Sequence, residues 1–292
     1  MSAPVSTLFC FGLGASALVL ARRLRAEGWR VAGTCRGAEK AAALAAEGFE
    51  THLFDGERPM ADSRAALAGA THLLMSAPPG PDGDPVLRHH AADIAGLSGG
   101  LAWIGYLSTT GVYGDRQGGW VDEASDLRPS GERGRRRLDA ENAWLALGRA
   151  HGLPVHLFRL AGIYGPHSNA LITVREGRGQ RVDKPGQVFS RIHVEDIAEV
   201  LRASIAQPNP GAAYNVCDDN PAPPEEVIRH ACELLGVAPP PLVPFEQAQL
   251  SPMARSFYAD NKRVDNTRIK RELGVTLRYP DYKAGLAALL KP

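Results

Sequence analysis

The first residues whose types and spacing could do chemistry lie near the N-terminus. Gly12, Gly14 and Ala17 follow the pattern G-x-G-x-x-A, with Ala15 and Ser16 before the alanine. In this pattern the first glycine allows a tight turn, the second lets a pyrophosphate approach the backbone, and the small third residue lets a helix pack on a strand. The N-terminus of that helix directs unpaired N–H groups at phosphates. The spacing predicts that all five residues contact a dinucleotide; the alternative is a simple backbone turn.

The end of the second expected strand distinguishes the two nicotinamide cofactors. An NAD site typically has an acidic residue there, which binds the ribose 2′-hydroxyl. This chain has Cys35 and then Arg36, and Glu39 comes only one helical turn later. A guanidinium can pair bidentately with a 2′-phosphate. We therefore predict NADP, with NAD as the alternative cofactor; Arg36 could otherwise be a solvated loop residue.

The elements that must position these residues alternate regularly. Apolar runs predict strands, and segments with helical periodicity between them predict helices. Such alternation indicates βαβ units, and right-handed crossovers then give a doubly wound parallel sheet of the Rossmann type in an α/β protein. The expected strands are 6–11, 30–35, 49–54, 71–77, 101–109 and 154–160, and the expected helices are 15–27, 38–47, 62–68, 85–97 and 134–151.

The pattern becomes less regular after about residue 164. Residues 1–165 are predicted to form the dinucleotide-binding core, to which residues 189–207 return. A smaller substrate lobe is expected over 166–188 and 208–292, with helices at 225–235, 266–273 and 282–290.

The overall composition excludes several classes of protein. The 292 residues are 44% hydrophobic, and 33 basic against 32 acidic side chains leave a net charge of +1. This balance argues against a dedicated nucleic-acid binder. The four cysteines form no Cys-x-x-Cys pair, and His89–His90 has no third ligand nearby, so no disulfide framework or metal site is expected.

One apolar segment resembles a targeting sequence. Residues 5–21 carry no charge, and Arg22 follows them. A signal peptide has its positive charge first, and a bilayer span needs about 20 apolar residues. Gly12 and Gly14 divide the segment into a strand and a helix. We therefore expect a cytoplasmic protein that does not bind a membrane.

Several short motifs in fixed order resemble one enzyme family. They are the S-T-T-G-V-Y-G run at 108–114, R-x-x-x-x-Y-G-P at 159–166, I-H-V-x-D at 192–196, Y-N-V at 214–216 and D-N…E-L-G at 265–274. Together they resemble the extended short-chain dehydrogenases/reductases, the NAD-dependent epimerase/dehydratase group, over nearly the whole chain. The resemblance implies an NAD(P)-binding protein. It also implies that Asp55 contacts the adenine, with a loop cap as the alternative, and we place Ala77 at the cofactor too.

The family's catalytic pattern is incomplete in this sequence. Its members use a Ser or Thr with Tyr-x-x-x-Lys, and Thr109 matches the first position. The family register places Arg137 at the lysine and Arg133 at the tyrosine, and residues 130–141 contain no tyrosine. Because arginine does not deprotonate in proteins, it cannot move a proton. We predict a catalytic set of Thr109, Arg137 and Tyr164, in which Arg137 holds ribose or phosphate; Tyr113 and Tyr164 are alternative acids, or merely pack in loops.

Two functions stay open. One is an oxidoreductase or epimerase that acts on a small polar substrate with non-standard catalytic residues. The other is a protein that binds NADP without turnover, as a redox or metabolite sensor. The basic cluster at 133–137 favours either an anionic substrate or a solvated helix face. The family also implies a homodimer through helices 85–97 and 134–150, with an apolar face of Ala91, Ile94, Ala95, Ala143, Trp144 and Leu147.

Overall fold

The computed structural model describes residues 5–290. The chain divides into two compact units. The first comprises Met1–Ser108, Arg136–Phe158 and Ala198–Ala213, and the second comprises Thr109–Arg135, Arg159–Ile197 and Tyr214–Pro292. Each unit is described separately below.

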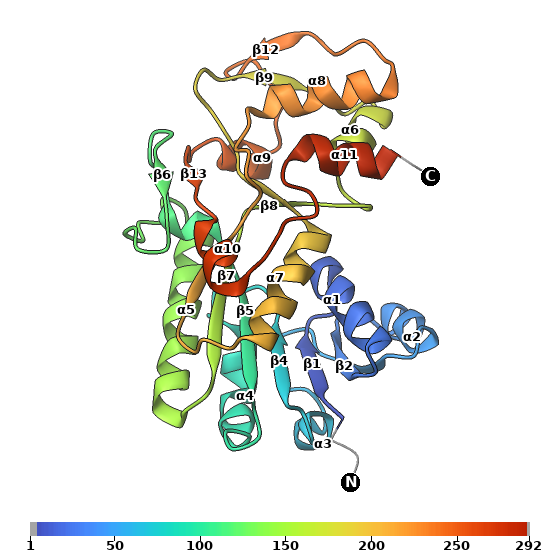
Figure 1. Cartoon of the computed structure of the whole chain (residues 1–292), viewed down its shortest axis with the longest axis vertical. Helices are drawn as coiled ribbons and strands as arrows, with labels where there is room; N and C mark the ends of the chain where they lie inside the picture. The colour runs from blue at the N-terminus through green and yellow to red at the C-terminus, as the bar shows by residue number, and fades with distance from the viewer. Residues whose placement is uncertain (1–4, 291–292) are drawn as a thin grey trace. The chain divides into compact units, whose positions relative to one another are not determined.

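A seven-stranded sheet forms the centre of the fold (Figure 1). Its strand order is β11-β7-β5-β4-β1-β2-β3, and β1 pairs in parallel with β2 and β4, as do β2 with β3 and β4 with β5. The predicted doubly wound parallel sheet is confirmed. The strands are β1 (Thr7–Phe11), β2 (Arg30–Cys35), β3 (Glu50–Leu53), β4 (His72–Met75), β5 (Trp103–Thr109), β7 (Val155–Leu160) and β11 (Ala213–Val216).

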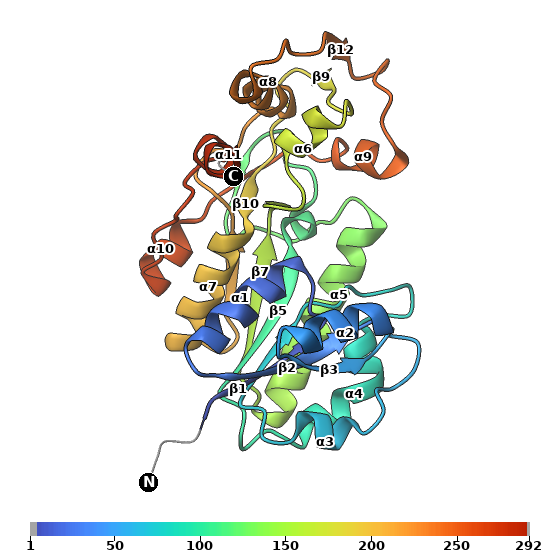
Figure 2. The same ribbon diagram turned by 90° about the vertical axis from the view of Figure 1, so that its right-hand side faces the viewer.

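Helices cover both faces of this sheet (Figure 2). They are α1 (Ala15–Ala26), α2 (Ala38–Ala46), α3 (Ser63–Leu67), α4 (Pro85–Ala95), α5 (Glu132–His151) and α7 (Val194–Ala206). Helices α1 and α7 lie side by side, joined by ion pairs from Arg23 to Glu199 at 3.1 Å and from Arg202 to Glu27 at 2.7 Å. Helices α3, α4 and α5 cover the opposite face.

The core of the first unit is closed by aromatic side chains. Trp103, Tyr106 and Trp144 are fully buried, and so is Ile94 on α4. Trp144 and Ile94 therefore cannot supply the dimer interface predicted for them, because their side chains are already removed from water within one copy of the chain. The dimer itself stays a prediction.

The second unit consists of short elements with small sheets. Strands β10 (Arg191–His193) and β8 (Gly162–Tyr164), β12 (Leu242–Pro244) and β9 (Arg181–Asp183), and β13 (Arg263–Val264) and β6 (Trp120–Val121) pair in parallel. The remaining elements are the 3₁₀ turn η1 (Thr110–Tyr113) and helices α6 (Ala170–Arg175), α8 (Pro224–Leu235), α9 (Pro252–Phe257), α10 (Thr267–Leu273) and α11 (Tyr282–Leu290).

Across residues 5–290, no helix combines the length and apolar character needed to cross a bilayer.

Candidate functional site

The glycine loop at the end of β1 forms a tightly packed turn in the first unit. Gly12 has φ +97°, a conformation that favours glycine, and a Cβ there would lie 3.2 Å from the backbone N of Ala77. The Gly12 N–H donates to Thr34 Oγ1 at 2.9 Å, and the Leu13 N–H donates to the Thr34 carbonyl at 2.8 Å. The loop is thus fastened to the end of β2 and brought against the end of β4.

Helix α1 begins directly after this loop. Gly14 is its N-cap residue and offers no side-chain cap, and no acidic residue occupies its first turn. The N–H groups of the first turn have no partner within the helix. Ala15 and Ser16 therefore present donors and a positive dipole end, as a phosphate requires.

Two basic side chains lie just beyond β2. Arg36 and Lys40 are both exposed, and neither makes a hydrogen bond or ion pair to any residue between 5 and 290. Lys40 lies on α2, four residues after Arg36, and sequence reasoning overlooked it.

The two other residues assigned to the cofactor follow β4 and β3, which are separated in the sheet by β1 and β2. Ala77 is half-buried, and its N–H donates to the Phe11 carbonyl at 2.9 Å. Asp55 is exposed after β3, where its Oδ1 accepts from the Glu57 N–H at 2.9 Å. That backbone hydrogen bond lowers the pKa of Asp55. Asp55 thus caps its own loop, and its contact with an adenine stays a prediction.

Arg137 lies on α5 and contacts the end of β5. Its Nη1 donates to the Leu107 carbonyl and, at 3.4 Å, to the Tyr106 hydroxyl. Its guanidinium lies 5.8 Å from the centre of the Tyr106 ring. One face of Arg137 therefore packs on the protein, and the other guanidinium nitrogens have no partner among the described residues.

Thr109 belongs to the second unit and caps the turn η1. Its Oγ1 accepts from the Gly111 N–H at 3.1 Å. The hydroxyl proton of Thr109 is thereby left to donate to a ligand. Gly114 ends the turn at φ +68°, where a Cβ would lie 1.9 Å from the Arg128 carbonyl oxygen, so only glycine fits there.

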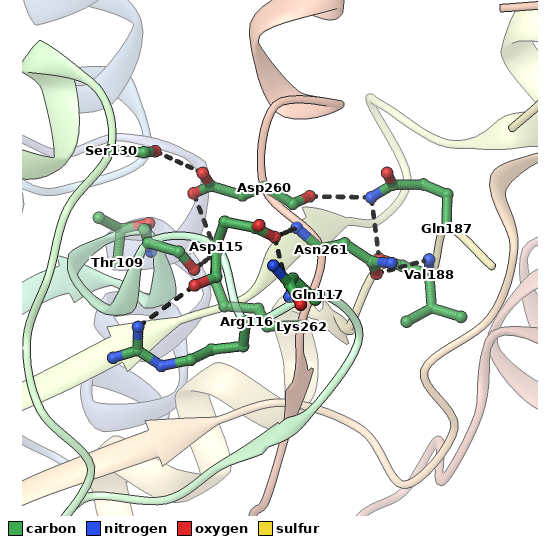
Figure 3. A network of polar contacts seen from close by, with 12 residues as sticks. Thr109, Asp115, Arg116, Gln117, Ser130, Gln187, Val188, Asp260, Asn261 and Lys262 are labelled. Atoms are coloured by element: carbon green, nitrogen blue, oxygen red, sulfur yellow. Dashed lines mark hydrogen bonds and ion pairs between the residues drawn. The ribbon is translucent and has the colours of Figure 1, made fainter. Parts of the chain in front are cut away.

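A network of polar contacts holds this turn in place (Figure 3). Lys262 Nζ donates to the Gly114 carbonyl at 3.0 Å and pairs with Asp260 Oδ2 at 3.0 Å. Ser130 donates to the same carboxylate, and the Asn261 N–H donates to Asp115 Oδ1 at 2.8 Å. Sequence reasoning did not find Lys262, because it is about 150 residues away from Thr109 in the chain and belongs to no motif.

Tyr113 is held as part of the framework of the second unit. It is fully buried, donates to Asn215 Oδ1 at 2.7 Å and accepts from Arg159 Nη1 at 3.0 Å. Burial raises its pKa to about 12. This geometry favours a packing role for Tyr113 over a role as the catalytic acid.

Tyr164 borders a cavity of about 310 Å³ in the second unit. Its hydroxyl donates to the Asp281 carbonyl at a long 3.4 Å, and its ring meets His193 edge-on at 5.1 Å. Burial raises the pKa of Tyr164, and the carboxylates of Asp218, Asp196 and Asp281 raise it further. Tyr164 can therefore donate a hydrogen bond to a ligand in place of the Asp281 carbonyl, but it ionises with difficulty.

Arg133 and Arg135 of the basic cluster belong to the second unit and are both exposed. Arg133 is exposed, with its guanidinium 5.4 Å from the centre of the Phe257 ring. Arg135 Nη1 donates to the Ser130 carbonyl at 3.2 Å. These contacts favour the solvated-face interpretation for both side chains.

Comparisons with known proteins give a family match for part of the chain and relatives for nearly all of it. Residues 91–217 match the model of the "NAD dependent epimerase/dehydratase family". A protein from Silicibacter pomeroyi DSS, described as functionally unknown and conserved, is 53% identical and has a TM-score of 0.89, with 98% of each chain covered. Protein YeeZ of Escherichia coli (strain K12) is 29% identical over 92% of this chain and 95% of its own.

A more distant structure shows the same fold. The dTDP-glucose 4,6-dehydratase of Bacillus anthracis, solved in complex with NAD, has a TM-score of 0.76 at 16% identity, with 98% of this chain and 96% of that chain covered. The order of motifs, the doubly wound sheet and the family match point the same way: residues 91–217 are similar to the NAD-dependent epimerase/dehydratase family, and the chain has the fold of that dehydratase.

Proposed function

We propose that the first unit binds a nicotinamide dinucleotide, with its pyrophosphate over the loop between β1 and α1. The observation that carries this proposal is the tight turn at Gly12, which has φ +97° and packs so closely that a Cβ would lie 3.2 Å from the Ala77 N. The neighbouring first turn of α1 offers N–H donors to the phosphates. The dehydratase of similar fold was solved with NAD.

Substitution of Gly12 tests the cofactor site. Gly12→Ala introduces a side chain at positive φ, which costs about 1–2 kcal/mol, and its Cβ would lie 3.2 Å from the Ala77 N, so the loop that meets the pyrophosphate must shift. We expect a loss of dinucleotide affinity of about tenfold or more by calorimetry. Gly99→Ala is the matched control, because a Cβ at Gly99 has open space. Unchanged affinity in Gly12→Ala, with the fold intact by circular dichroism, would refute the site.

The preferred cofactor in this proposal is NADP. Arg36 and Lys40 are exposed beyond β2, and neither has a partner among the described residues. A charge-assisted bond to a 2′-phosphate is worth roughly 1.5–3 kcal/mol, so Arg36→Ala should remove about a tenfold preference for NADP. Arg149→Ala changes an equally exposed arginine in the last turn of α5 and should leave the preference unchanged. Equal affinities of the native chain for NAD and NADP would contradict this choice.

The proposed activity is that of an oxidoreductase or epimerase on a small polar molecule. The bound cofactor would supply hydride transfer. Thr109 would orient the reacting oxygen with the proton that its bond from Gly111 leaves available. Arg137 would stabilise negative charge on ribose, phosphate or substrate, and Tyr164 would donate a hydrogen bond. The cytoplasm is the proposed location.

The sensor is a second candidate because α5 carries no tyrosine. A general acid or base typically contributes about 10²–10⁴-fold to a rate, so its loss favours binding without turnover. The two functions are separated by a panel of carbonyl and hydroxyl substrates followed at the NADPH absorbance. Turnover that depends on Thr109 supports the enzyme, whereas tight NADP binding without any turnover supports the sensor.

A further inference from the structure

The cavity that Tyr164 borders lies wholly within the second unit. It measures about 310 Å³ and is enclosed mainly by α6, β9, α8 and α11. Val182, Val227 and Leu286 contribute to its apolar walls. Cavities of about 300–1,000 Å³ typically hold small molecules, so this one has room for a compact ligand. We call it the Arg191 pocket, after the charged residue at the start of β10.

Arg191 is held in this pocket with most of its donors unused. Its Nη1 donates to the carbonyls of Phe189 at 2.8 Å and Ala222 at 3.1 Å. No carboxylate between residues 5 and 290 lies within ion-pair distance of it, and its Nε and Nη2 make no hydrogen bond there. A guanidinium withdrawn from water without a paired anion is energetically costly. The arrangement therefore suits an anion supplied from outside.

Other donors face the same pocket, while acids do not. Tyr258 and Tyr282 line it, and their hydroxyls make no hydrogen bond to the described residues. The Tyr282 ring centre lies 6.0 Å from the Arg191 guanidinium carbon. Arg178 also lines the pocket, but its guanidinium is paired with Glu176, with Nε to Oε2 at 2.8 Å, so Arg191 carries the charge that a ligand would meet. No aspartate or glutamate is among the described residues that line the walls. The donors and the charge thus select a negatively charged ligand.

The nearest buried acid, Asp218, does not neutralise Arg191 directly. Its N–H donates to the Arg191 carbonyl at 2.6 Å, but its carboxylate makes no ion pair with that guanidinium, and its Oδ2 has no partner within residues 5–290. Burial raises the pKa of Asp218 to about 7, so the acid carries only part of its charge at neutral pH. Asp218 therefore neutralises little of the positive charge of Arg191, and that charge stays available to a ligand.

We propose that the Arg191 pocket binds the carboxylate or phosphate group of a compact, partly apolar molecule, with Arg191 as the bidentate partner and Tyr258 and Tyr282 as further donors. The identification of this molecule as the substrate rests on the function proposed above. The existence of the anion site does not depend on that function.

The test measures binding of defined probes to the full chain without cofactor. Benzoate, phenyl phosphate, inorganic phosphate and the neutral benzamide are titrated by calorimetry. Because a bidentate charge-assisted pair is worth about tenfold or more in affinity, an aromatic anion should bind at least that much better than benzamide. Comparing benzoate with phenyl phosphate identifies the preferred anionic group.

Matched variants assign the binding to Arg191. Arg191→Gln should abolish the preference for anions, whereas Arg149→Gln, at an exposed position on α5, should leave it unchanged. Arg191→Lys keeps the charge but loses the bidentate geometry and should show an intermediate affinity. If Arg191→Gln fails to fold, Tyr258→Phe and Tyr282→Phe serve instead, because they remove only hydroxyls. Each should lower the affinity for the anion by about threefold or more.

The results separate this inference from the proposed function. Anions that bind no better than benzamide, or equally well to folded Arg191→Gln, would overturn the pocket assignment even if NADP binds. Loss of anion binding in Arg191→Gln with NADP affinity unchanged would support it. Anion binding in a chain that fails to bind either NAD or NADP would leave the pocket standing and refute the proposed function.

Discussion

Asp218 makes the stability of this protein depend on pH in a direction opposite to that of an ordinary surface acid. Its side chain is 1% exposed, and its Oδ2 has no partner among the described residues. Burial raises its pKa to about 7, although the hydrogen bond from the Asn220 N–H and the charge of Arg191 both act to lower it. In the unfolded chain an aspartate has a pKa of about 3.9.

The sign follows from the two pKa values. Because the folded pKa exceeds the unfolded one, folding favours the protonated acid, and the stabilisation present below about pH 4 is lost as the pH rises through about 7. Asp218→Asn cannot ionise and escapes this loss. With about 1.4 kcal/mol per pKa unit, the variant should gain roughly 2–3 kcal/mol relative to the native chain between about pH 5 and about pH 8.

The assay is urea unfolding of both chains at several pH values, followed by tryptophan fluorescence. The difference between the two chains cancels the other titrating groups, notably His72 and His193. Burial lowers the pKa of both histidines to about 4, so they destabilise the fold as the pH falls below about 6.5. Asp183→Asn changes an exposed acid and is the control: its difference in unfolding free energy from the native chain should stay the same at every pH. A flat or falling difference for Asp218→Asn would refute the reasoning.

Three further predictions concern other parts of the molecule. Asp84→Ala should lower the free energy of unfolding by about 2–4 kcal/mol, measured by heat or urea. The reason is that Asp84 Oδ1 caps α4 by accepting from the Val86 and Leu87 N–H groups at 2.9 and 3.1 Å, and its Oδ2 accepts from Trp144 Nε1 at 3.2 Å. The control Asp82→Ala, at an exposed position, should cost under about 0.5 kcal/mol. Any NADPH-linked turnover should survive Arg133→Lys better than Thr109→Ala, since arginine moves no proton; the reverse order would show that Thr109 is outside the active site. Light scattering at tens of micromolar should give the mass of a dimer formed through α4 and α5, and a monomer mass there would reject the interface.

The regular half of the fold could be read from the sequence because its signals are local. Strand β2 and helix α11 occur at their predicted bounds, and the other long elements differ by a few residues at their ends. Apolar runs and helical periodicity act over one element at a time, and right-handed crossovers between parallel strands indicate a doubly wound sheet. The G-x-G-x-x-A loop also lies at the expected strand-to-helix turn, since only glycine tolerates the backbone at Gly12.

The second unit could be read much less well. Short strands such as β8, β9 and β10 have three residues each, which is too few for periodicity to separate them from loops. Their partners are distant in the chain, so pairing rather than propensity determines them. Helix α6 escaped prediction for the same reason.

The sequence by itself determined which residue types are present, the family motifs and the loss of the tyrosine from α5. Only the tertiary structure decided what each candidate touches. It buried Tyr113 between Asn215 and Arg159, and it packed Trp144 into the core instead of an interface. It also left Arg191 in a cavity whose other walls come from residues as distant as Leu286. Burial and charge pairing arise from contacts between remote segments, and no local pattern encodes them.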